Sequence, residues 1–400
     1  MQVDRRRMLT ILGACAAGLC MTGAARPAAS CGEASATMRA VWISTVANID
    51  WPSRRGLSVA DQQQEYRAIL DNAVALRLDT VMVQVRPTAD ASWPSPFEPW
   101  SAWLTGTQGA DPGYDPLAFL VAEAHARGLA FHAWFNPYRV STQGDPGQLA
   151  ENHPARRHPD WIFGYGGGLY YDPGLPEVRD FVTSAIMDAV TRYDVDGVHL
   201  DDYFYPYPVA GEEIPDGAAF AAHANGFADL GDWRRDNVNQ LIKSLSDRVH
   251  AAKPGVPFGV SPFGIWRTAA ADPRGSATGG TQSFSAIYAD TWTWVKQGWL
   301  DYVIPQIYWE IGHPVADYST LVAWWAGLVA GTPCALYVGQ AAYKVGSSPA
   351  WDDGELARHL AVNARYPQVR GNAYFSATSL ATNARVGMER VVAEGGCGPR

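Results

Sequence analysis

Two adjacent carboxylates close a short apolar run in the segment DGVHLDDYFYPYP, which contains Asp201 and Asp202. Because successive strand residues point to opposite faces, we expect Asp201 to share a face with His199. Asp202 then points the other way, unless the backbone turns there. Carboxyl groups near a glycosidic oxygen can act as acid, base or nucleophile, so both residues are candidate catalytic groups. Asp202 is equally interpreted as a cap or as an ion-pair partner of Arg139 or Arg267.

A second catalytic acid is expected from another strand. Hydrolysis by two protein carboxyls requires them to flank the scissile bond, about 5–5.5 Å apart in retaining enzymes and about 6.5–9.5 Å apart in inverting ones. Neighbours in the chain do not easily flank one bond. Asp50, Asp90 and Glu310 each follow an apolar run, and we take Glu310 as the third candidate catalytic residue.

The elements that would position these acids alternate regularly along the chain. Apolar runs begin near Arg39, Asp79, Leu129, Asp196, Val256, Asp301, Cys334 and Gly371. Helical patterns between them begin at Ser58 and cover 116–128, 176–192, 233–252, 284–297, 316–328, 354–364 and 378–393. The alternation predicts an α/β fold, a (β/α)8 TIM-type barrel. A doubly wound sheet is the alternative, but no glycine-rich phosphate loop follows the first run. Extended loops at 87–114, 136–175, 203–232 and 263–283 follow strands, on the face where barrel enzymes hold their active sites.

Polar residues alternate with the apolar ones in several of these runs and are expected to face the barrel axis. Buried polar groups cost free energy unless they are paired, so the pattern indicates a pocket. We expect the substrate-binding residues to be Trp51, Gln84, Arg86, Asp90, His132, Trp134, Asn136, Arg139, His199, Tyr203, Ser261, Gln306, Tyr308 and Trp309.

Three classes of function are compatible with this pocket. We expect a glycoside hydrolase without metal or cofactor. One alternative is a metal-dependent polysaccharide hydrolase or deacetylase, in which His132, His199 and Asp201 would converge on the ion. The other is a non-catalytic glycan-binding barrel, which would not need acids in the barrel mouth.

The composition argues against a nucleic-acid partner and is compatible with a sugar ligand. The 400-residue chain carries a net charge of -9, and no Lys/Arg block follows Arg5–Arg7, so we expect no nucleic-acid partner. It contains 16 Trp, whose flat rings suit stacking on sugars. The sequence does not define the oligomeric state.

Residues 1–31 have the pattern of an export signal and short leader, ahead of a single barrel domain over 38–395. A positive start precedes an apolar middle and a small-residue end. Arg5 and Arg6 fit a twin-arginine signal, and an ordinary secretory signal with three arginines is the alternative. We expect export to the periplasm or cell surface, with Cys31 as a candidate lipid anchor. Cys334 and Cys397 form either a disulfide or two free thiols.

Long motifs also carry a resemblance to a known family. RAVWISTVANIDWPS, VQVRPTADASWPS, EAHARGLAFHAWFNPYR, DGVHLDDYFYPYP, FGVSPFGIWR and DYVIPQIYW occur in order. The chain resembles the glycosyl-hydrolase-like family 10, formerly domain of unknown function 187, over about 38–345. The resemblance implies a (β/α)8 barrel and a glycosidase role at the bacterial envelope. Some members act on peptidoglycan strands stripped of their peptides.

A fainter similarity concerns the fourth predicted strand. DGVHLD is similar to the α-amylase pattern whose last Asp is the nucleophile, which would give that role to Asp201. His199 stands where the amylase pattern has Arg. For the substrate, we expect a cell-wall glycan with lactyl carboxylates, which Arg86, Arg139 and Arg267 could bind. Each arginine is equally interpreted as a structural partner of Asp50, Asp90 or Asp202.

Overall fold

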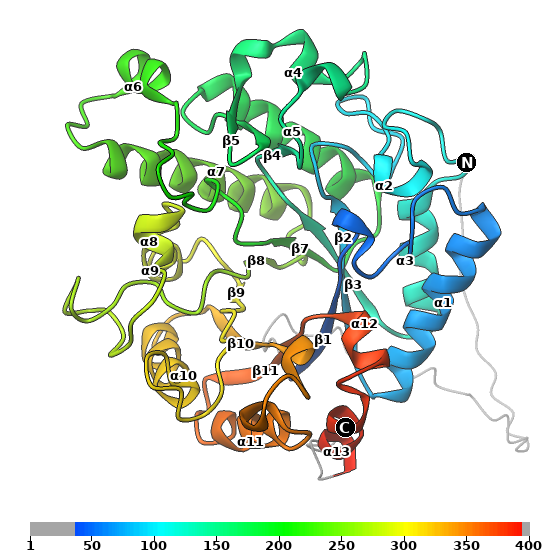
Figure 1. The fold of residues 1–400 in the computed structure, drawn as a ribbon, viewed down its shortest axis with the longest axis vertical. Helices are drawn as coiled ribbons and strands as arrows, with labels where there is room; N and C mark the ends of the chain where they lie inside the picture. Colours follow the sequence, from blue (N-terminus) through cyan, green and yellow to red (C-terminus); the bar gives the residue numbers. More distant parts are fainter. Residues whose placement is uncertain (1–36, 394–400) are drawn as a thin grey trace, which may run out of the picture. The chain divides into compact units, whose positions relative to one another are not determined.

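Eight parallel strands close into a barrel in a computed structural model that describes residues 37–393. Their order around the barrel is β1-β11-β10-β9-β8-β7-β3-β2. Figure 1 shows these strands at the centre, with helices around them. The prediction of a (β/α)8 barrel is confirmed. The barrel strands are β1 (Met38–Ile43), β2 (Thr80–Arg86), β3 (Ala130–Phe135), β7 (Gly197–Leu200), β8 (Phe258–Val260), β9 (Tyr302–Val303), β10 (Ala335–Gln340) and β11 (Val369–Tyr374).

Several connecting helices begin at side-chain caps, including the one expected to begin at Ser58. Ser58 accepts a hydrogen bond from the backbone of Asp61, and Asp115 accepts one from Ala118. Within residues 37–393, no helix has the length and apolar character needed to cross a membrane. The helices are α1 (Val59–Ala75), α2 (Ala102–Thr105), α3 (Pro116–Ala126), α4 (Pro154–Arg157), α5 (Pro176–Arg192), α6 (Gly217–His223), α7 (Leu230–Ala252), α8 (Ser283–Ala286), α9 (Thr291–Lys296), α10 (Tyr318–Val329), α11 (Glu355–Asn363), α12 (Ala377–Ala381) and α13 (Arg385–Ala393).

Two expected helices are each divided into two. The stretch expected to be one helix over 284–297 forms α8 and α9, because Tyr288 has a φ of 56° and Asp290 caps a new helix. Such a φ does not fit a right-handed helix. The stretch over 378–393 likewise divides into α12 and α13, with Thr382 outside the helical region. The leader and Cys397 lie outside the described residues.

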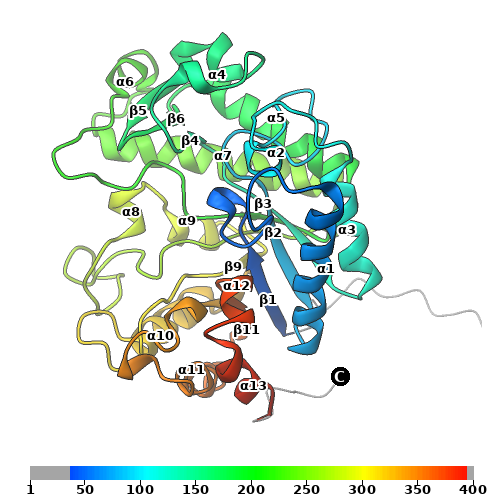
Figure 2. The same cartoon turned by 45° about the vertical axis from the view of Figure 1, so that its right-hand side comes forward.

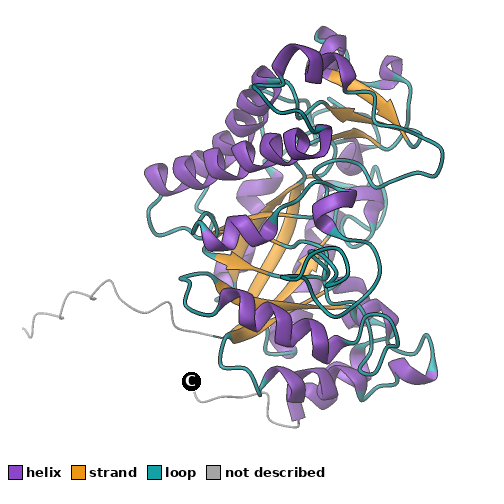
Figure 3. Cartoon of the chain, turned by 90° about the vertical axis from the view of Figure 1, so that its left-hand side faces the viewer, coloured by secondary structure: helices purple, strands orange, loops and turns teal. Residues whose placement is uncertain are grey.

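The extended loop at 136–175 contains a small sheet that the sequence analysis missed. Its strands β4 (Arg139–Ser141), β5 (Ile162–Tyr165) and β6 (Gly168–Tyr171) pair in the antiparallel order β4-β6-β5. Gly166 and Gly167 have φ values of 54° and 77°, as the tight turn between β5 and β6 requires. Figures 2 and 3 show this sheet beyond the barrel strands, near α4 and α6. It places Arg139, its first residue, beside the barrel mouth.

Glycines make room for large polar rings inside the barrel. A Cβ on Gly197 would lie 2.4 Å from the His132 ring, and one on Gly259 would lie 2.3 Å from the Tyr302 ring. The interior also holds Trp42 and Trp134. The barrel therefore carries a layer of aromatic and imidazole rings below its mouth, in place of the branched aliphatic residues common in such barrels.

Candidate active site

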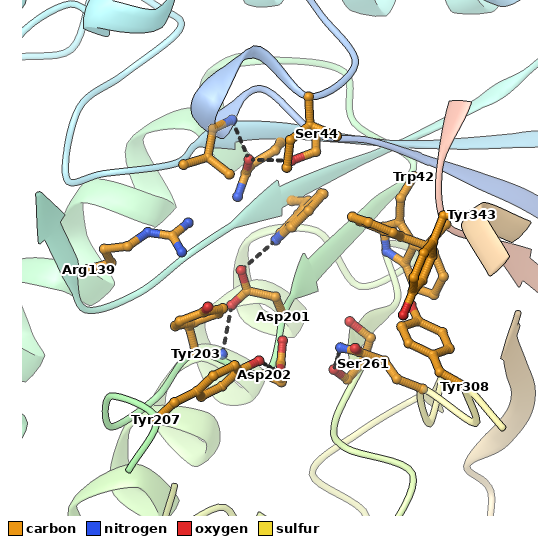
Figure 4. Close-up of a pocket in the computed structure, with 16 residues that line it drawn as sticks. Trp42, Ser44, Arg139, Asp201, Asp202, Tyr203, Tyr207, Ser261, Tyr308 and Tyr343 are labelled. Atoms are coloured by element: carbon orange, nitrogen blue, oxygen red, sulfur yellow. Dashed lines mark hydrogen bonds between the residues drawn. The ribbon is translucent and has the colours of Figure 1, made fainter. Parts of the chain in front are cut away.

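A cavity of about 280 Å³ opens where the barrel strands end. Figure 4 shows its walls, with Asp201 and Asp202 directed into it. The predicted residues that line it are Gln84, Trp134, Arg139, Asp201, Asp202, Tyr203, Ser261, Gln306 and Tyr308. The lining residues that were not among the predicted site residues are Trp42, Ser44, Val46, Ile49, Tyr207, Tyr343 and Phe375.

Asp201 is held by donors from β3, from the residue just after it and from its own turn. Trp134 Nε1 donates to its carboxylate at 3.1 Å, Asn136 Nδ2 at 3.0 Å, and the Tyr203 backbone N–H at 3.1 Å. Burial and the nearby charge of Asp202 raise the pKa of Asp201 to about 7, while Arg139 and Asn136 oppose the increase. The orientation of the Asp201 carboxylate is therefore fixed, and its ionisation depends on that of Asp202.

Asp202 lines the same cavity as Asp201, so it does not point the other way as strand alternation alone would place it, and the exception of a backbone turn applies. The physical reason is that β7 ends at Leu200, and the alternation of a strand ends with it. The Tyr207 hydroxyl donates to Asp202, and burial raises the pKa of this carboxyl as well. Two close, buried carboxyls do not ionise independently, and the pair resists losing its last proton near neutral pH.

Glu310 does not line the cavity, although it was expected to act there. Its carboxylate accepts a hydrogen bond from Trp351 Nε1 at 3.0 Å. The strand β9 covers only Tyr302–Val303, so the predicted alternation does not extend to Glu310. Asp201 and Asp202 are therefore the only acidic side chains along the cavity in the described part of the chain.

The other two acids that follow apolar runs, Asp50 and Asp90, form hydrogen bonds outside the cavity. Asp50 accepts hydrogen bonds from the backbone of Ser44 and Thr378, each at 2.8 Å, and so ties the first and last loops of the barrel together. Asp90 lies in a separate depression, where it accepts from Ala102 and Gln108. Burial raises the pKa of Asp90 to about 6.

His132 and His199 lie below the cavity, fully surrounded by protein. His132 Nδ1 lies 3.0 Å from the Tyr302 hydroxyl, and His199 Nδ1 lies 3.2 Å from the same oxygen. Ser261 Oγ is 3.0 Å from His199 Nε2. Burial lowers the pKa of His132 to about 4 and that of His199 well below its usual range.

Within 37–393, no group of three or more His, Cys, Asp or Glu is arranged to hold a metal ion. The structure does not bring His132, His199 and Asp201 together as ligands.

The predicted arginines differ in what they contact. Arg86 is fully buried, and its Nε donates to Glu98 at 2.7 Å. Arg267 is paired with Asp272 at 2.8 Å. Arg139 lines the cavity, donates to the Pro87 carbonyl, and places its guanidinium 4.6 Å from the centroid of the Tyr203 ring. Of these three, Arg139 alone is placed to contact a ligand in the cavity.

The remaining predicted residues support the walls or lie away from them. Asn136 stands behind Asp201 as a donor. Trp51 is buried and donates to the Gln62 carbonyl at 2.8 Å, and Trp309 lies against the backbone at Gly264.

Among the cavity residues that were not predicted, Trp42 lies between the outward-facing Val41 and Ile43, so strand alternation could have identified it. Tyr343 and Phe375 follow the last two strands, from which the sequence analysis took no site residues.

Fold and site together define a barrel glycoside hydrolase, with carboxyls in a polar and aromatic cavity at the carboxyl ends of the strands. Residues 37–355 match the model of the family described as Glycosyl hydrolase-like 10, and the chain belongs to this family. The class and the family expected from the sequence are thus confirmed.

Two relatives and one solved structure are similar to this chain. The chain is 51% identical over 352 residues to glycosyl hydrolase YngK of Bacillus subtilis (strain 168), covering 86% of this chain and 69% of that protein. It is 42% identical over 374 residues to glycosyl hydrolase DigH of Escherichia coli (strain K12), covering 88% and 85%. The PgaB (BpsB) glycoside hydrolase domain from Bordetella bronchiseptica has a similar fold, with a TM-score of 0.55 at 13% identity, covering 89% of this chain and 98% of that one.

Proposed function

We propose that this glycoside hydrolase cleaves bacterial peptidoglycan strands that have lost their peptides. The observation that carries the proposal is the pair Asp201 and Asp202, the only carboxyls along the cavity in the described residues. A pair that keeps one proton near neutral pH supplies a general acid and a carboxylate at the same place. A barrel that only bound glycan would not require such a pair.

Arg139 supports the choice of a peptide-stripped strand. Each muramic acid carries a lactyl group whose carboxyl is amide-bonded in intact peptidoglycan and becomes a free carboxylate once the peptide is removed. A guanidinium binds a carboxylate strongly and in a defined geometry. Arg139 borders the cavity, and no carboxylate of the described residues forms an ion pair with it. A free lactyl group would therefore be a suitable partner.

The proposal includes export, because peptidoglycan lies outside the cytoplasmic membrane. The leader at 1–31 supports this location through its Arg5, Arg6 pattern and the apolar stretch that follows. Replacing both arginines with lysine and fractionating the cells tests the twin-arginine route. Retention of the double variant in the cytoplasm supports that route, whereas unchanged export contradicts it.

The activity is tested by incubating the purified protein with matched glycans and separating the released fragments by mass spectrometry. Peptidoglycan strands stripped by an amidase should be shortened, and intact peptidoglycan should be cleaved far more slowly. Starch, xylan and cellulose fragments serve as controls for a general glycosidase. Cleavage of those controls with stripped strands left intact would refute the proposed substrate. Binding of the strands without release of reducing ends would refute the enzymatic role.

A further inference from the structure

The two aspartates stand on one side of the cavity, and aromatic residues stand on the other. In Figure 4, Asp201 and Asp202 lie with Tyr203 and Tyr207, across from Trp42, Tyr308 and Tyr343. The strand order agrees with the picture, because β7 lies across the closed barrel from β11. The residues near β11 that line the cavity, including Phe375, are aromatic.

This one-sided arrangement conflicts with both standard mechanisms of glycoside hydrolysis. A retaining enzyme usually places a carboxylate nucleophile on the face of the sugar opposite the leaving group, while the acid stands beside the leaving oxygen. An inverting enzyme places a carboxylate base beyond a water on that opposite face. The cavity wall across from Asp201 and Asp202 offers no carboxylate for either role among residues 37–393. The group that attacks the sugar must then have another source.

We propose that the substrate supplies this group: the carbonyl oxygen of the sugar's own 2-acetamido substituent attacks the anomeric carbon. The inference rests on the proposed function, since it requires an N-acetylated sugar at the site. Asp201 binds and orients the acetamido N–H, and Asp202 protonates the leaving oxygen. Substrate assistance of this kind is a known exception to the two-carboxylate scheme.

Hydrogen-bond donors decide which aspartate has which role. Every protein partner of Asp201 is an N–H group of Trp134, Asn136 or Tyr203, and none of these can accept a proton. They fill about three of the roughly four acceptor sites of a carboxylate and leave one for the acetamido N–H. They therefore hold Asp201 as the anion.

Asp202 has a partner of a different kind. The Tyr207 hydroxyl donates to the Asp202 carboxylate, as Gln306 also does, but unlike an N–H group a hydroxyl can rotate and accept once the carboxyl is protonated. In the enzyme without glycan, a protonated Asp202 can therefore donate its hydrogen bond to the Tyr207 hydroxyl. When a glycan strand binds, Asp202 can donate the same proton to the glycosidic oxygen. With one proton shared by the pair, only Asp202 has a partner that can accept it, so we assign Asp202 as the acid.

The first step forms a bond between the acetamido oxygen and C1 and breaks the bond between C1 and the glycosidic oxygen. The leaving oxygen keeps the bonding electron pair and takes the proton of Asp202. The product is an oxazolinium ion, whose N–H stays bonded to the Asp201 carboxylate. Water then attacks C1, gives its proton to Asp202, and reopens the ring. The configuration at C1 is retained, and no covalent bond to the enzyme forms.

The aromatic wall fits the part of the acetamido group that does not react. Trp42 of this wall is 2% exposed, and both its ring and that of Trp134, which is 6% exposed and stands beside Asp201, reach the cavity. The acetamido methyl group gains free energy when such rings cover it. A sugar bearing a free amine or a hydroxyl at C2 would offer neither the methyl group nor the nucleophile.

The experiment uses two sets of stripped glycan strands of equal length, one N-acetylated and one chemically deacetylated. The proposal predicts that deacetylation lowers kcat/KM by on the order of 100-fold or more, comparable to loss of a general catalyst. Nuclear magnetic resonance should show net retention in the first product, and a thiazoline analogue of N-acetylglucosamine should inhibit competitively. Inversion, equal cleavage of both strands, or a fluorosugar covalently attached to an aspartate would overturn it. Failure to cleave N-acetylated strands at all would refute the proposed function as well.

Variants separate the two aspartates. Asp202→Asn should lose activity on strands but keep it on an N-acetylated aryl glycoside, whose leaving group needs no proton. Asp201→Asn should lower activity on both substrates and weaken thiazoline binding. Asp247→Asn, at a side chain 63% exposed on α7, is the matched control and should behave as wild type. The opposite pattern, with Asp201→Asn rescued by the aryl leaving group, would contradict the assignment of roles.

Discussion

The indole nitrogen of Trp42 lies 3.2 Å from Nε2 of His199, across the inside of the barrel. An indole N–H can only donate, so Nε2 of His199 accepts and its proton is on Nδ1, facing the Tyr302 hydroxyl. Since burial also lowers the pKa of His199 well below its usual range, the imidazole is neutral. Three strands, β1, β7 and β9, thereby share one hydrogen-bonded layer beneath the cavity.

Because this layer already uses both nitrogens of His199, metal removal is expected to leave activity unchanged. The test is dialysis of the purified enzyme against a strong chelator, followed by the strand-cleavage assay and elemental analysis. The same enzyme with zinc added back is the control. Loss of activity on dialysis with recovery on adding zinc would favour the metal-dependent alternative.

A substitution below the cavity should disturb this layer without touching the aspartates. In Gly259→Ala, the new Cβ would lie 2.3 Å from the Tyr302 ring, which must move and break its bonds to His132 and His199. We expect a loss of about 1–3 kcal/mol in the free energy of unfolding, as for an overpacked core. Denaturant unfolding monitored by tryptophan fluorescence measures this change.

Gly327→Ala is the matched control for that prediction. Gly327 is exposed within α10, and a Cβ there meets nothing within 4 Å. Alanine in a helix should stabilise the protein by roughly 0.5–1 kcal/mol. Equal effects of the two substitutions would show that the ring layer is not as tightly packed as described.

The sequence predicts the barrel well because the barrel strands and the helices between them have local patterns of apolar residues. Alternation places Gln84 and Trp134 correctly, since β2 and β3 are long regular strands. The same rule fails for Asp202 and Glu310, which follow the short strands β7 and β9. There the direction of a side chain depends on loop turns and on contacts made far along the chain, such as that between Glu310 and Trp351. Such contacts leave no periodic pattern to read.

The aspartate pair should also make stability depend on pH. Burial and the adjacent Asp202 raise the pKa of Asp201 to about 7 in the folded protein, above the ordinary value of about 3.9 for an unfolded chain. Because the two carboxyls ionise together, this value describes one proton that the pair shares, whichever carboxyl carries it. The folded pair therefore binds a proton more tightly than the unfolded chain. The stabilisation is complete below about pH 4 and is lost as the pH rises through about 7. Asp201→Asn removes one carboxyl of the pair and the charge repulsion between the two, so its melting temperature should fall less than that of wild type over this range.

Thermal melts of both proteins at a series of pH values test that prediction. Asp247→Asn, an exposed substitution of the same type, should keep the wild-type dependence. Parallel curves for wild type and Asp201→Asn would show that the pair does not titrate as the burial of its carboxyls indicates.

Arg139 should decide whether the enzyme prefers acidic strands. Its Nε and Nη2 are bound to the Pro87 carbonyl at 3.2 and 3.1 Å, which fixes the guanidinium plane and leaves Nη1 for a ligand. Arg139→Met keeps much of the side-chain volume and removes the charge. A hydrogen bond to a charged group contributes about 1.5–3 kcal/mol, so kcat/KM on peptide-stripped strands should fall by about 10-fold to 100-fold. N-acetylglucosamine oligomers of the same length lack the lactyl carboxylate, and any loss on them should be smaller. An equal loss on both substrates would show that Arg139 acts through the aspartates or the fold, and not through the lactyl group.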